Sequence, residues 1–566
     1  MKELSLKIIM SIKSLRLRSV KYILLPVIAI AAALIIAHDT SGVIQQNSPE
    51  TANYSLSEQA CTSNLSDSLT PGADVPPGAD VPPGTDVLED SEISPVSDIP
   101  QGLDASSDPN ALNQQDPSES PEGDDQIDAE PIPDWVGKVN GFDINFNALI
   151  RRDAGNGALK ALHEYFATQT PSGQNEKTGI FEGYNLITIS AEALTSYVID
   201  PELTPTLYMM QQDGIYFDNF YGFYGGGTIS GELSLISGLA PGGGHSWCNN
   251  AARKHLPFSF ASQFNAMGIQ PNAYHNGTYT FYDRNIMFPN LGYIFRARKV
   301  GMDFQGPGWH MTDKQLIELS IDQYIDDERF YVHYMTVSGH SPYSYQENGV
   351  ARKNRDAVDH LQYSHRVKAY LATQMELEYA MTYLLERLEE KGIAEKTLIV
   401  MTTDHYPYGL TTREVEELAG HRFDTAFGLH KNACLIYVKG MEPDIIDAPS
   451  FTPDIVPTVS NLMGLPFDSR FLPGRDVYSD EKPVIFLPCG FMTDVGYYER
   501  GRNRFTPFEE GKEIPEDYVS TISNIVNMRK SAIERTIQLD YFAKIADQLK
   551  PTYGDPQWRV PGPYNT

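Results

Sequence analysis

Basic residues are scarce in this chain, and over one long stretch they are absent. The sequence has 44 Lys and Arg against 74 Asp and Glu, which gives a net charge of -30. Between Glu50 and Asp134 about twenty acidic residues occur without one Lys or Arg, so roughly two-thirds of the excess charge lies there. A chain with this balance repels a phosphate backbone, which argues against nucleic acid as a partner.

Cysteine is also rare. The four cysteines, Cys61, Cys248, Cys434 and Cys489, show no metal-ligand spacing. Cys61 lies in the acidic stretch, and Cys434 lies in an apolar run that is typical of a core. In an exported chain a disulfide between Cys248 and Cys489 is one possible pairing, which the sequence does not decide.

One long apolar run, Tyr22 to Ala37, follows a basic segment that ends at Lys21. At 1.5 Å per residue the run makes a helix of about 24 Å, which spans a bilayer if Lys21 snorkels and the ends tilt. A cleaved signal peptide is the alternative. The small residues Ala31 to Ala33 lie inside the run rather than after it, which favours an uncleaved anchor. We predict a cytoplasmic N-terminus at residues 1–21, a single-pass signal anchor at residues 22–38 and an extracellular remainder.

Residues 39–135 are rich in Pro, Gly, Ser, Asp and Asn and include the repeat Pro-Gly-Ala-Asp-Val-Pro. Such a segment has too little apolar surface to fold, so we predict a disordered acidic linker. As a coil it would span roughly 50 to 60 Å. It would hold an extracellular domain near the membrane.

Residues 136–500 alternate apolar runs with helix-like stretches, which indicates an α/β domain with a mostly parallel sheet sandwiched by helices. A C-terminal helical extension is predicted at residues 501–566. The predicted strands are Asn185–Ser190, Ile215–Phe220, Tyr331–Val337, Thr397–Thr403, Ala433–Val438 and Pro483–Leu487. The predicted helices are Ile229–Ser237, Lys314–Tyr324, Tyr370–Lys391 with Gly392 as its cap, Pro453–Met463 and Tyr518–Leu549.

Several candidate functional residues stand just past the ends of predicted strands, where ligands bind in open α/β sheets. They are Glu192, His340 and the pair Asp404-His405. Thr228 follows three glycines and precedes a predicted helix, so its hydroxyl would face the positive end of a helix dipole. A hydroxyl, two carboxylates and an imidazole suggest a hard cation site beside a nucleophile.

These residues lie in ordered motifs that resemble the lipoteichoic acid synthase group. This group contains the phosphoglycerol transferases and related sulfatase-fold enzymes of the alkaline phosphatase superfamily. The resemblance runs from about Tyr184 to Leu487. The motifs are Ile-Ser-Ala-Glu ending at Glu192, the glycine-rich loop with Thr228, Tyr-His-Asn-Gly with His275, Asp-Arg-Asn with Arg284, Gly-Trp-His-Met-Thr-Asp-Lys from Gly308, Ser-Gly-His-Ser-Pro with His340, Thr-Thr-Asp-His with Asp404 and His405, and Pro-Asp-Ile-Val-Pro-Thr from Pro453 to Thr458.

The resemblance implies an alkaline-phosphatase/sulfatase-like fold and a metal-dependent transfer. Glu192, Thr228, Asp404 and His405 would bind Mn²⁺, although Mg²⁺ or Zn²⁺ suits these ligands equally. Thr228 would attack phosphatidylglycerol, release diacylglycerol and carry phosphoglycerol to an alcohol, glycolipid or glycan acceptor. The implied substrate-binding residues are His275, Tyr282, Arg284 and His340. No protein partner follows from the sequence.

The chain departs from the group at three points. Gly227 replaces a lysine before the nucleophile, and Tyr282 replaces a tryptophan two residues before the arginine. The synthases have several transmembrane helices, whereas one at most is expected here, which argues against processive polymer synthesis. A phosphoethanolamine transferase, a phosphodiesterase and a non-catalytic phosphoglycan-binding protein remain alternatives. A formylglycine-dependent sulfatase is excluded, because none of the cysteines is followed by x-Pro-x-Arg.

Overall fold

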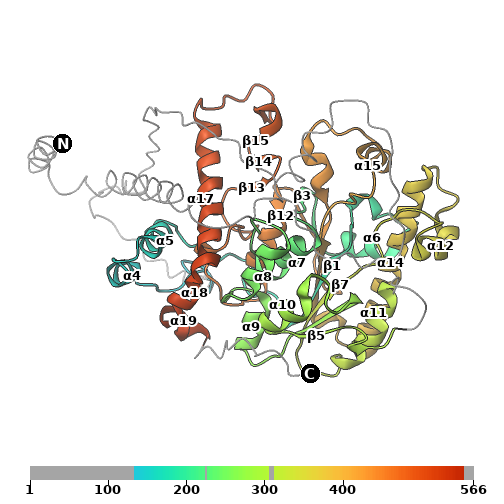
Figure 1. The fold of residues 1–566 in the computed structure, drawn as a ribbon, viewed down its shortest axis with the longest axis horizontal. Helices are drawn as coiled ribbons and strands as arrows, with labels where there is room; N and C mark the ends of the chain where they lie inside the picture. Colours follow the sequence, from blue (N-terminus) through green and yellow to red (C-terminus); the bar gives the residue numbers. More distant parts are fainter. Residues whose placement is uncertain (1–132, 224–225, 305–311, 554–566) are drawn as a thin grey trace, which may run out of the picture.

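A nine-stranded sheet forms the centre of the protein (Figure 1). The computed structural model describes residues 133–223, 226–304 and 312–553. Neighbouring strands follow the order β11-β2-β10-β8-β1-β7-β4-β5-β6. Strand β10 is antiparallel to both of its neighbours, and the other pairs are parallel. The strands are β1 (Asn185–Ala191), β2 (Ile215–Phe217), β4 (Asn272–Thr278), β5 (Ile294–Arg298), β6 (Gly301–Met302), β7 (Tyr331–Met335), β8 (Thr397–Thr403), β10 (Cys434–Tyr437) and β11 (Asp444–Ile446). The predicted mostly parallel sheet is confirmed.

Both faces of this sheet are covered by helices, which explains why β1, β7 and β8 are buried along their whole length. Side chains alternate between the faces, so Leu186 joins one core and Ile187 joins the other. Helices packed on the Leu186 face are α7 (Thr228–Ser237), α8 (His245–Ala252), α9 (Phe260–Ala266), α10 (Arg284–Asn290) and α16 (Ile455–Leu462). Those on the Ile187 face include α6 (Pro205–Gln212), α11 (Asp313–Ser320), α14 (His365–Lys391) and α15 (Thr412–Ala419). The predicted cap of α14 is confirmed, since Gly392 has φ 75°.

The predicted strand Ile215–Phe220 is in fact two strands. Strand β2 ends at Phe217, and β3 (Phe220–Tyr221) joins β9 (Lys431–Asn432) and β12 (Ser450–Phe451) in a separate sheet. Asp218 and Asn219 form the turn between them, and both residue types favour turns. The run of aromatic residues on either side of this turn concealed the break.

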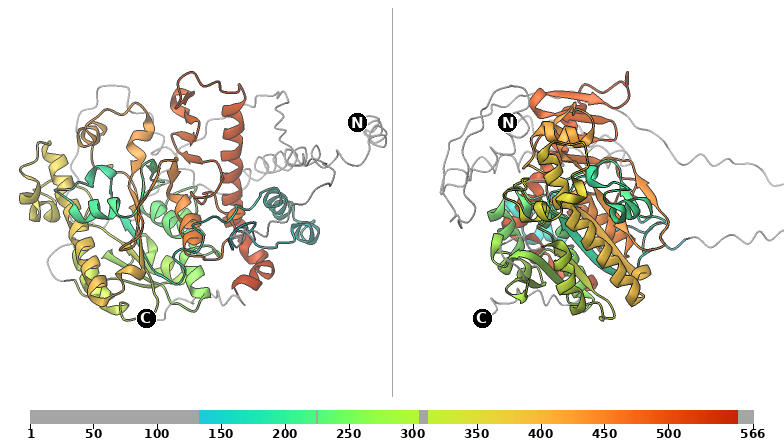
Figure 2. Two further views of the ribbon diagram at one scale, coloured as in Figure 1. Left: turned by 180° about the vertical axis from the view of Figure 1, so that it is seen from behind. Right: turned by 90° about the vertical axis from the view of Figure 1, so that its right-hand side faces the viewer.

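The last part of the described chain adds a second layer beside the main sheet. Strands β13 (Val484–Leu487), β14 (Gly490–Thr493), β15 (Gly496–Glu499) and β16 (Arg504–Pro507) form an antiparallel sheet. Figure 2 shows this sheet alongside the long helix α17 (Tyr518–Leu539). The predicted C-terminal helical extension at residues 501–566 therefore also contains a strand, β16, before its helices begin. The predicted strand Pro483–Leu487 exists as β13, but it pairs in this second sheet.

The predicted helix Tyr518–Leu549 is also divided. After α17 the chain turns at Asp540, which has φ 47°, and continues as α18 (Tyr541–Lys544) and α19 (Ala546–Tyr553). The Asp540 carboxylate accepts hydrogen bonds from the backbone N–H and from Nδ1 of His255. Two N-terminal helices, α4 (Phe146–Arg152) and α5 (Gly157–Ala167), pack against this end of the chain in a small aromatic core.

Several predictions fall outside the described residues. They concern the N-terminus at 1–21, the anchor at 22–38, nearly all of the linker at 39–135, Cys61 and the motif start at Gly308. None of the helices in the described ranges has the length and apolar character needed to cross a bilayer. Cys248, Cys434 and Cys489 are buried, and Cys248 and Cys434 are free thiols. Cys248 and Cys489 therefore do not form the disulfide that the sequence left undecided. Cys434 is a core residue, as predicted.

Two glycines bring the loops at the carboxyl edge of the sheet into direct contact. A Cβ atom on Gly231 of α7 would lie 2.0 Å from the carbonyl oxygen of Asp404, which follows β8. A Cβ atom on Gly339, after β7, would lie 2.2 Å from the carbonyl oxygen of Glu192, which follows β1. Only glycine permits such close backbone approach. The segments that carry the candidate site residues are therefore packed without intervening side chains.

We expect Gly231→Ala to destabilise the protein by about 1 to 3 kcal/mol, because the added methyl group meets rigid backbone. Gly155→Ala is the matched control, since no atom lies within 4 Å of its added Cβ. Denaturant unfolding of both purified variants measures the difference. Equal stability of the two variants would contradict the packing described for α7.

Candidate metal centre and active site

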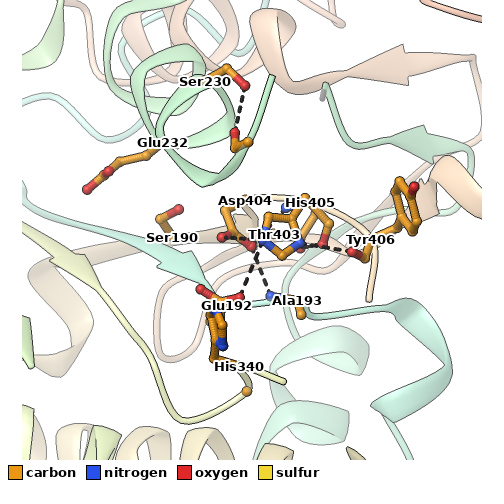
Figure 3. A network of polar contacts seen from close by, with 12 residues as sticks. Ser190, Glu192, Ala193, Ser230, Glu232, His340, Thr403, Asp404, His405 and Tyr406 are labelled. Carbon is orange, nitrogen blue, oxygen red and sulfur yellow. Dashed lines mark hydrogen bonds and ion pairs between the residues drawn. The ribbon is translucent and has the colours of Figure 1, made fainter. Parts of the chain in front are cut away.

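The pairing of β1 with β8 places two acidic residues side by side. The strands are parallel, and Ala191 is the register partner of Thr403. Glu192 and Asp404 are the next residues of each chain segment, so both emerge at the same edge of the sheet. His405 follows Asp404. Figure 3 shows the three side chains meeting there, with His340 beside Glu192.

Glu192, Asp404 and His405 form a buried cluster whose ligand atoms all lie within 4.8 Å of one another. His405 Nδ1 donates to the Tyr406 carbonyl at 2.9 Å, so Nε2 carries the lone pair. That Nε2 lies 3.2 Å from Asp404 Oδ2 and 3.4 Å from Glu192 Oε1. Within the described structure, neither carboxylate oxygen has a hydrogen-bond partner. Buried acceptors that face one another in this way fit a divalent cation.

The electrostatics of the cluster also favour a cation. Burial, together with the neighbouring charge of Asp404, raises the pKa of Glu192 well above its ordinary value. Two buried carboxylates at this distance cannot both ionise without compensation. A bound divalent cation would supply that compensation.

Backbone contacts hold the cluster rigidly. The second oxygen of Asp404, Oδ1, accepts from the N–H groups of Ala193 and His405 at 2.9 and 2.8 Å. Ala193 has φ 53°, a strained value for a residue with a side chain, and such strain is concentrated at functional sites. From α14, Tyr370 donates to the Ala193 carbonyl at 2.7 Å, which helps to hold this conformation.

Thr228 is the first residue of α7 and is buried. It lies one helical turn before Gly231, which contacts Asp404. Residues three apart share a helix face, so the threonine lies on the side of α7 that faces the cluster. Its side chain is a hydrogen-bonding neighbour of the Tyr282 hydroxyl. Gly227 before it has φ 105°, a conformation that residues with side chains rarely adopt.

Tyr282 and Arg284 come from the start of α10. The Arg284 guanidinium lies over the Tyr282 ring, 5.4 Å from its centroid. Tyr282 also has a left-handed backbone with φ 56°. Arg284 is 1% exposed and pairs with Glu232 of α7. Arg284 is therefore part of the core and not of a surface loop.

The two predicted substrate histidines are both turned inward, and His340 lies beside the cluster. His275 in β4 donates from Nδ1 to the Met335 carbonyl at 3.0 Å. Burial, with the positive charge of Arg284, lowers the pKa of His275 to about 3. His340 donates from Nδ1 to the Ser341 carbonyl, and its pKa is lowered, chiefly by burial. Both rings are therefore neutral near pH 7 and present Nε2 as an acceptor.

Glu232 was missed at the sequence level. It lies four residues after Thr228 in a helix that is otherwise apolar or small, Thr-Ile-Ser-Gly-Glu-Leu-Ser-Leu-Ile-Ser. A lone charge in such a helix is the signal that could have identified it, since unpaired charges are rarely buried. His430 is also buried, with its ring against Tyr406.

Comparisons with known proteins agree with this geometry. The protein-family model described as Sulfatase matches residues 188–465, which include the cluster and Thr228. Lipoteichoic acid synthase 2 of Bacillus subtilis (strain 168) is 25% identical over 361 residues, covering 60% of this chain and 54% of that protein. Lipoteichoic acid synthase of Staphylococcus aureus (strain NCTC 8325 / PS 47) is 22% identical over 394 residues, covering 65% and 55%. The chain thus spans just over half the length of these curated relatives.

A solved structure shares the fold. The crystal structure of the lipoteichoic acid synthase LtaP from Listeria monocytogenes superposes with a TM-score of 0.52 at 18% identity, covering 69% of this chain and 98% of that one. Together with the family match, this likeness confirms the predicted alkaline-phosphatase/sulfatase-like α/β fold.

We expect Mn²⁺ to raise the melting temperature more at pH 8 than at pH 6. Without metal, the raised pKa of Glu192 means that the folded protein keeps a proton which the unfolded chain loses, so stability falls as the pH rises above the ordinary value of 4.5. Cation binding needs the ionised carboxylate and releases that proton, so affinity rises with pH. Thermal unfolding at both pH values measures the effect.

Glu192→Gln should abolish the Mn²⁺ shift. Glu376→Gln is the control, because Glu376 is equally buried but pairs with Lys353 away from the cluster. A Mn²⁺ shift of wild-type size in Glu192→Gln would exclude this cluster as the metal site.

Proposed function

We propose that the protein is a metal-dependent phosphoglycerol transferase with a covalent threonine intermediate. Residues 188–465 match the Sulfatase family model, and the chain is similar to lipoteichoic acid synthases in sequence and in fold. One observation carries the proposal. A buried cluster of Glu192, Asp404 and His405 suited to a divalent cation lies beside the first turn of the helix that begins at Thr228.

Thr228 is proposed as the nucleophile. Its place at the start of α7 puts its oxygen at the positive end of the helix dipole, where negative charge on a phosphoryl group is stabilised. Glu192, Asp404 and His405 would hold the cation, Mn²⁺ in the first instance, with Thr228 Oγ as a further ligand. The cation would lower the pKa of the hydroxyl and polarise the phosphoryl group.

The transfer would proceed in two balanced steps. In the first, the Thr228 Oγ–P bond forms, the bond from phosphorus to the diacylglycerol oxygen breaks, and that oxygen gains the proton that Thr228 loses. In the second, the oxygen of an alcohol, glycolipid or glycan acceptor bonds to phosphorus, the Thr228 Oγ–P bond breaks, and Thr228 Oγ gains the proton that the acceptor hydroxyl loses. Water in place of the acceptor would make the same site a phosphodiesterase.

The remaining residues suit a phosphoglycerol group. Arg284 provides a guanidinium for a phosphate oxygen, and Tyr282 keeps its proton because burial raises its pKa. The neutral rings of His275 and His340 can accept hydrogen bonds from glycerol hydroxyls. An ethanolamine headgroup offers an ammonium group instead of the second hydroxyl, which makes phosphoethanolamine transfer the alternative to be tested.

The same proposal places the domain outside the cell. It rests on the apolar run at residues 22–38 and on the acidic linker, which would leave the site within reach of lipid headgroups.

We expect Thr228→Ala to lower diacylglycerol release from phosphatidylglycerol by at least about 10³-fold, since the attacking oxygen is gone. Ser237→Ala is the control, because Ser237 is a buried hydroxyl of the same helix that bonds to the Leu233 carbonyl. Release is measured with labelled lipid in vesicles that contain Mn²⁺.

Mass spectrometry of the wild-type protein after incubation with phosphatidylglycerol should find glycerophosphate on Thr228. Diacylglycerol release at the wild-type rate by the Thr228→Ala variant would refute Thr228 as the nucleophile. Faster turnover of phosphatidylethanolamine than of phosphatidylglycerol would favour the alternative headgroup.

A further inference from the structure

A buried ion pair connects the helix of Thr228 to the segment of Arg284. Arg284 Nε lies 2.9 and 3.3 Å from the two oxygens of Glu232, and Nη2 lies 2.8 Å from Oε2. The side chains of Arg284 and Glu232 are 1% and 0% exposed. Nε donates hydrogen bonds to both carboxylate oxygens, which fixes the direction of the guanidinium, whereas Nη2 makes a close ion contact but no hydrogen bond.

The ion pair closes a ring of contacts around the site. Glu232 lies one helical turn after Thr228, and Thr228 neighbours the Tyr282 hydroxyl. The Tyr282 ring in turn lies beneath the Arg284 guanidinium, which returns to Glu232. The position of the arginine is therefore set relative to the helix of the nucleophile rather than to a loop.

Other buried groups fix Glu232 itself. His333 of β7 points Nε2 at Glu232 Oε1, 3.6 Å away, while its Nδ1 lies 2.9 Å from the Thr188 hydroxyl in β1. Burial opposes ionisation of Glu232, but Arg284 and His333 lower its pKa to about 2. The carboxylate is therefore charged at every pH at which the protein would work.

Stability alone does not account for this pair. Moving two charges into a core costs several kcal/mol for each ion, and apolar residues of the same volume often stabilise as well or better. The Arg284–Glu232 pair carries this desolvation cost and lies one helical turn from Thr228. Its effect on the orientation of Arg284 explains it better than its contribution to stability.

We propose that Glu232 is a positioning residue, which holds the Arg284 guanidinium in one orientation toward a phosphate oxygen of the substrate beside Thr228. The inference rests on the proposed function and extends it to a residue outside the cluster and the substrate contacts. Glu232 touches no reacting atom. It acts through Arg284, so its loss should impair phosphate binding and leave the cation site intact.

The test compares Glu232→Gln and Glu232→Asp with Glu376→Gln. Glutamine removes the charge at nearly constant shape, and aspartate keeps the charge but withdraws it by one methylene. Glu376→Gln changes a buried glutamate that pairs with a cation elsewhere. Each protein is assayed for diacylglycerol release, for binding of glycerol 1-phosphate by calorimetry, and for the Mn²⁺ shift in melting temperature.

We expect both Glu232 variants to bind glycerol 1-phosphate about 10 to 100 times more weakly and to raise KM, with the Mn²⁺ shift unchanged. The single variant Arg284→Lys and the double variant Glu232→Gln, Arg284→Lys complete the comparison. The double variant should bind glycerol 1-phosphate no more weakly than whichever of Glu232→Gln and Arg284→Lys binds it more weakly, because the two residues act as one unit. Should Glu232→Gln fail to fold, Glu232→Asp, which retains the buried charge at a greater distance from Arg284, gives the same comparison.

Wild-type affinity in either folded Glu232 variant, or additive losses in the double variant, would overturn the inference. Loss of the Mn²⁺ shift along with phosphate binding would also overturn it, because the role would then be general support of the site. Failure of the proposed function gives a different result. The wild-type protein would then bind glycerol 1-phosphate without releasing diacylglycerol.

Discussion

The parallel pairing of β1 with β8 is the constraint on which the site depends. With Ala191 opposite Thr403, the next residues, Glu192 and Asp404, must leave the sheet at the same edge. Any shift of register by one residue would turn one carboxylate to the opposite face. The helices on the two faces secure this register, since the strands between them are buried on both sides. Thr228 then reaches the same edge because Gly231 lets α7 rest on the carbonyl of Asp404.

Two kinds of buried acid result from this arrangement, and they differ in how their charge is balanced. Glu232 meets its counter-charge within the protein, and its pKa falls to about 2 despite burial. Glu192 faces another carboxylate, and its pKa is raised. The first acid is a permanent part of the core, whereas the second needs a partner from solution. Glu232 directly follows Gly231, the residue of α7 that rests on Asp404, so the buried ion pair and the cluster share a single rigid support.

The sequence was sufficient to predict the strands that carry the cluster, because a fully buried parallel strand is an uninterrupted apolar run and its carboxyl end is marked by the first acid. It also predicted Glu192, Asp404 and His405 as neighbours, and the structure brings them together. It could not predict the partner of Arg284, which lies 52 residues away on another helix. Nor could it predict that β10 is reversed or that β13 belongs to a second sheet. The hydrophobic pattern of a segment indicates which of its residues are buried. Strand pairing depends on contacts between segments far apart in the chain, so this pattern does not predict it.

The glycine at position 227 is explained by the same physical argument. A lysine there would add positive charge next to Thr228, but the backbone has φ 105°, which a residue with a side chain adopts only with strain. Gly227 also brings the chain within reach of Tyr282, whose hydroxyl would lie 3.7 Å from an added Cβ. Positive potential at Thr228 therefore comes from three sources: the start of α7, the cation that the cluster is suited to hold, and Arg284. Since Glu232 compensates much of the charge of Arg284, the arginine contributes directed hydrogen bonds more than net charge.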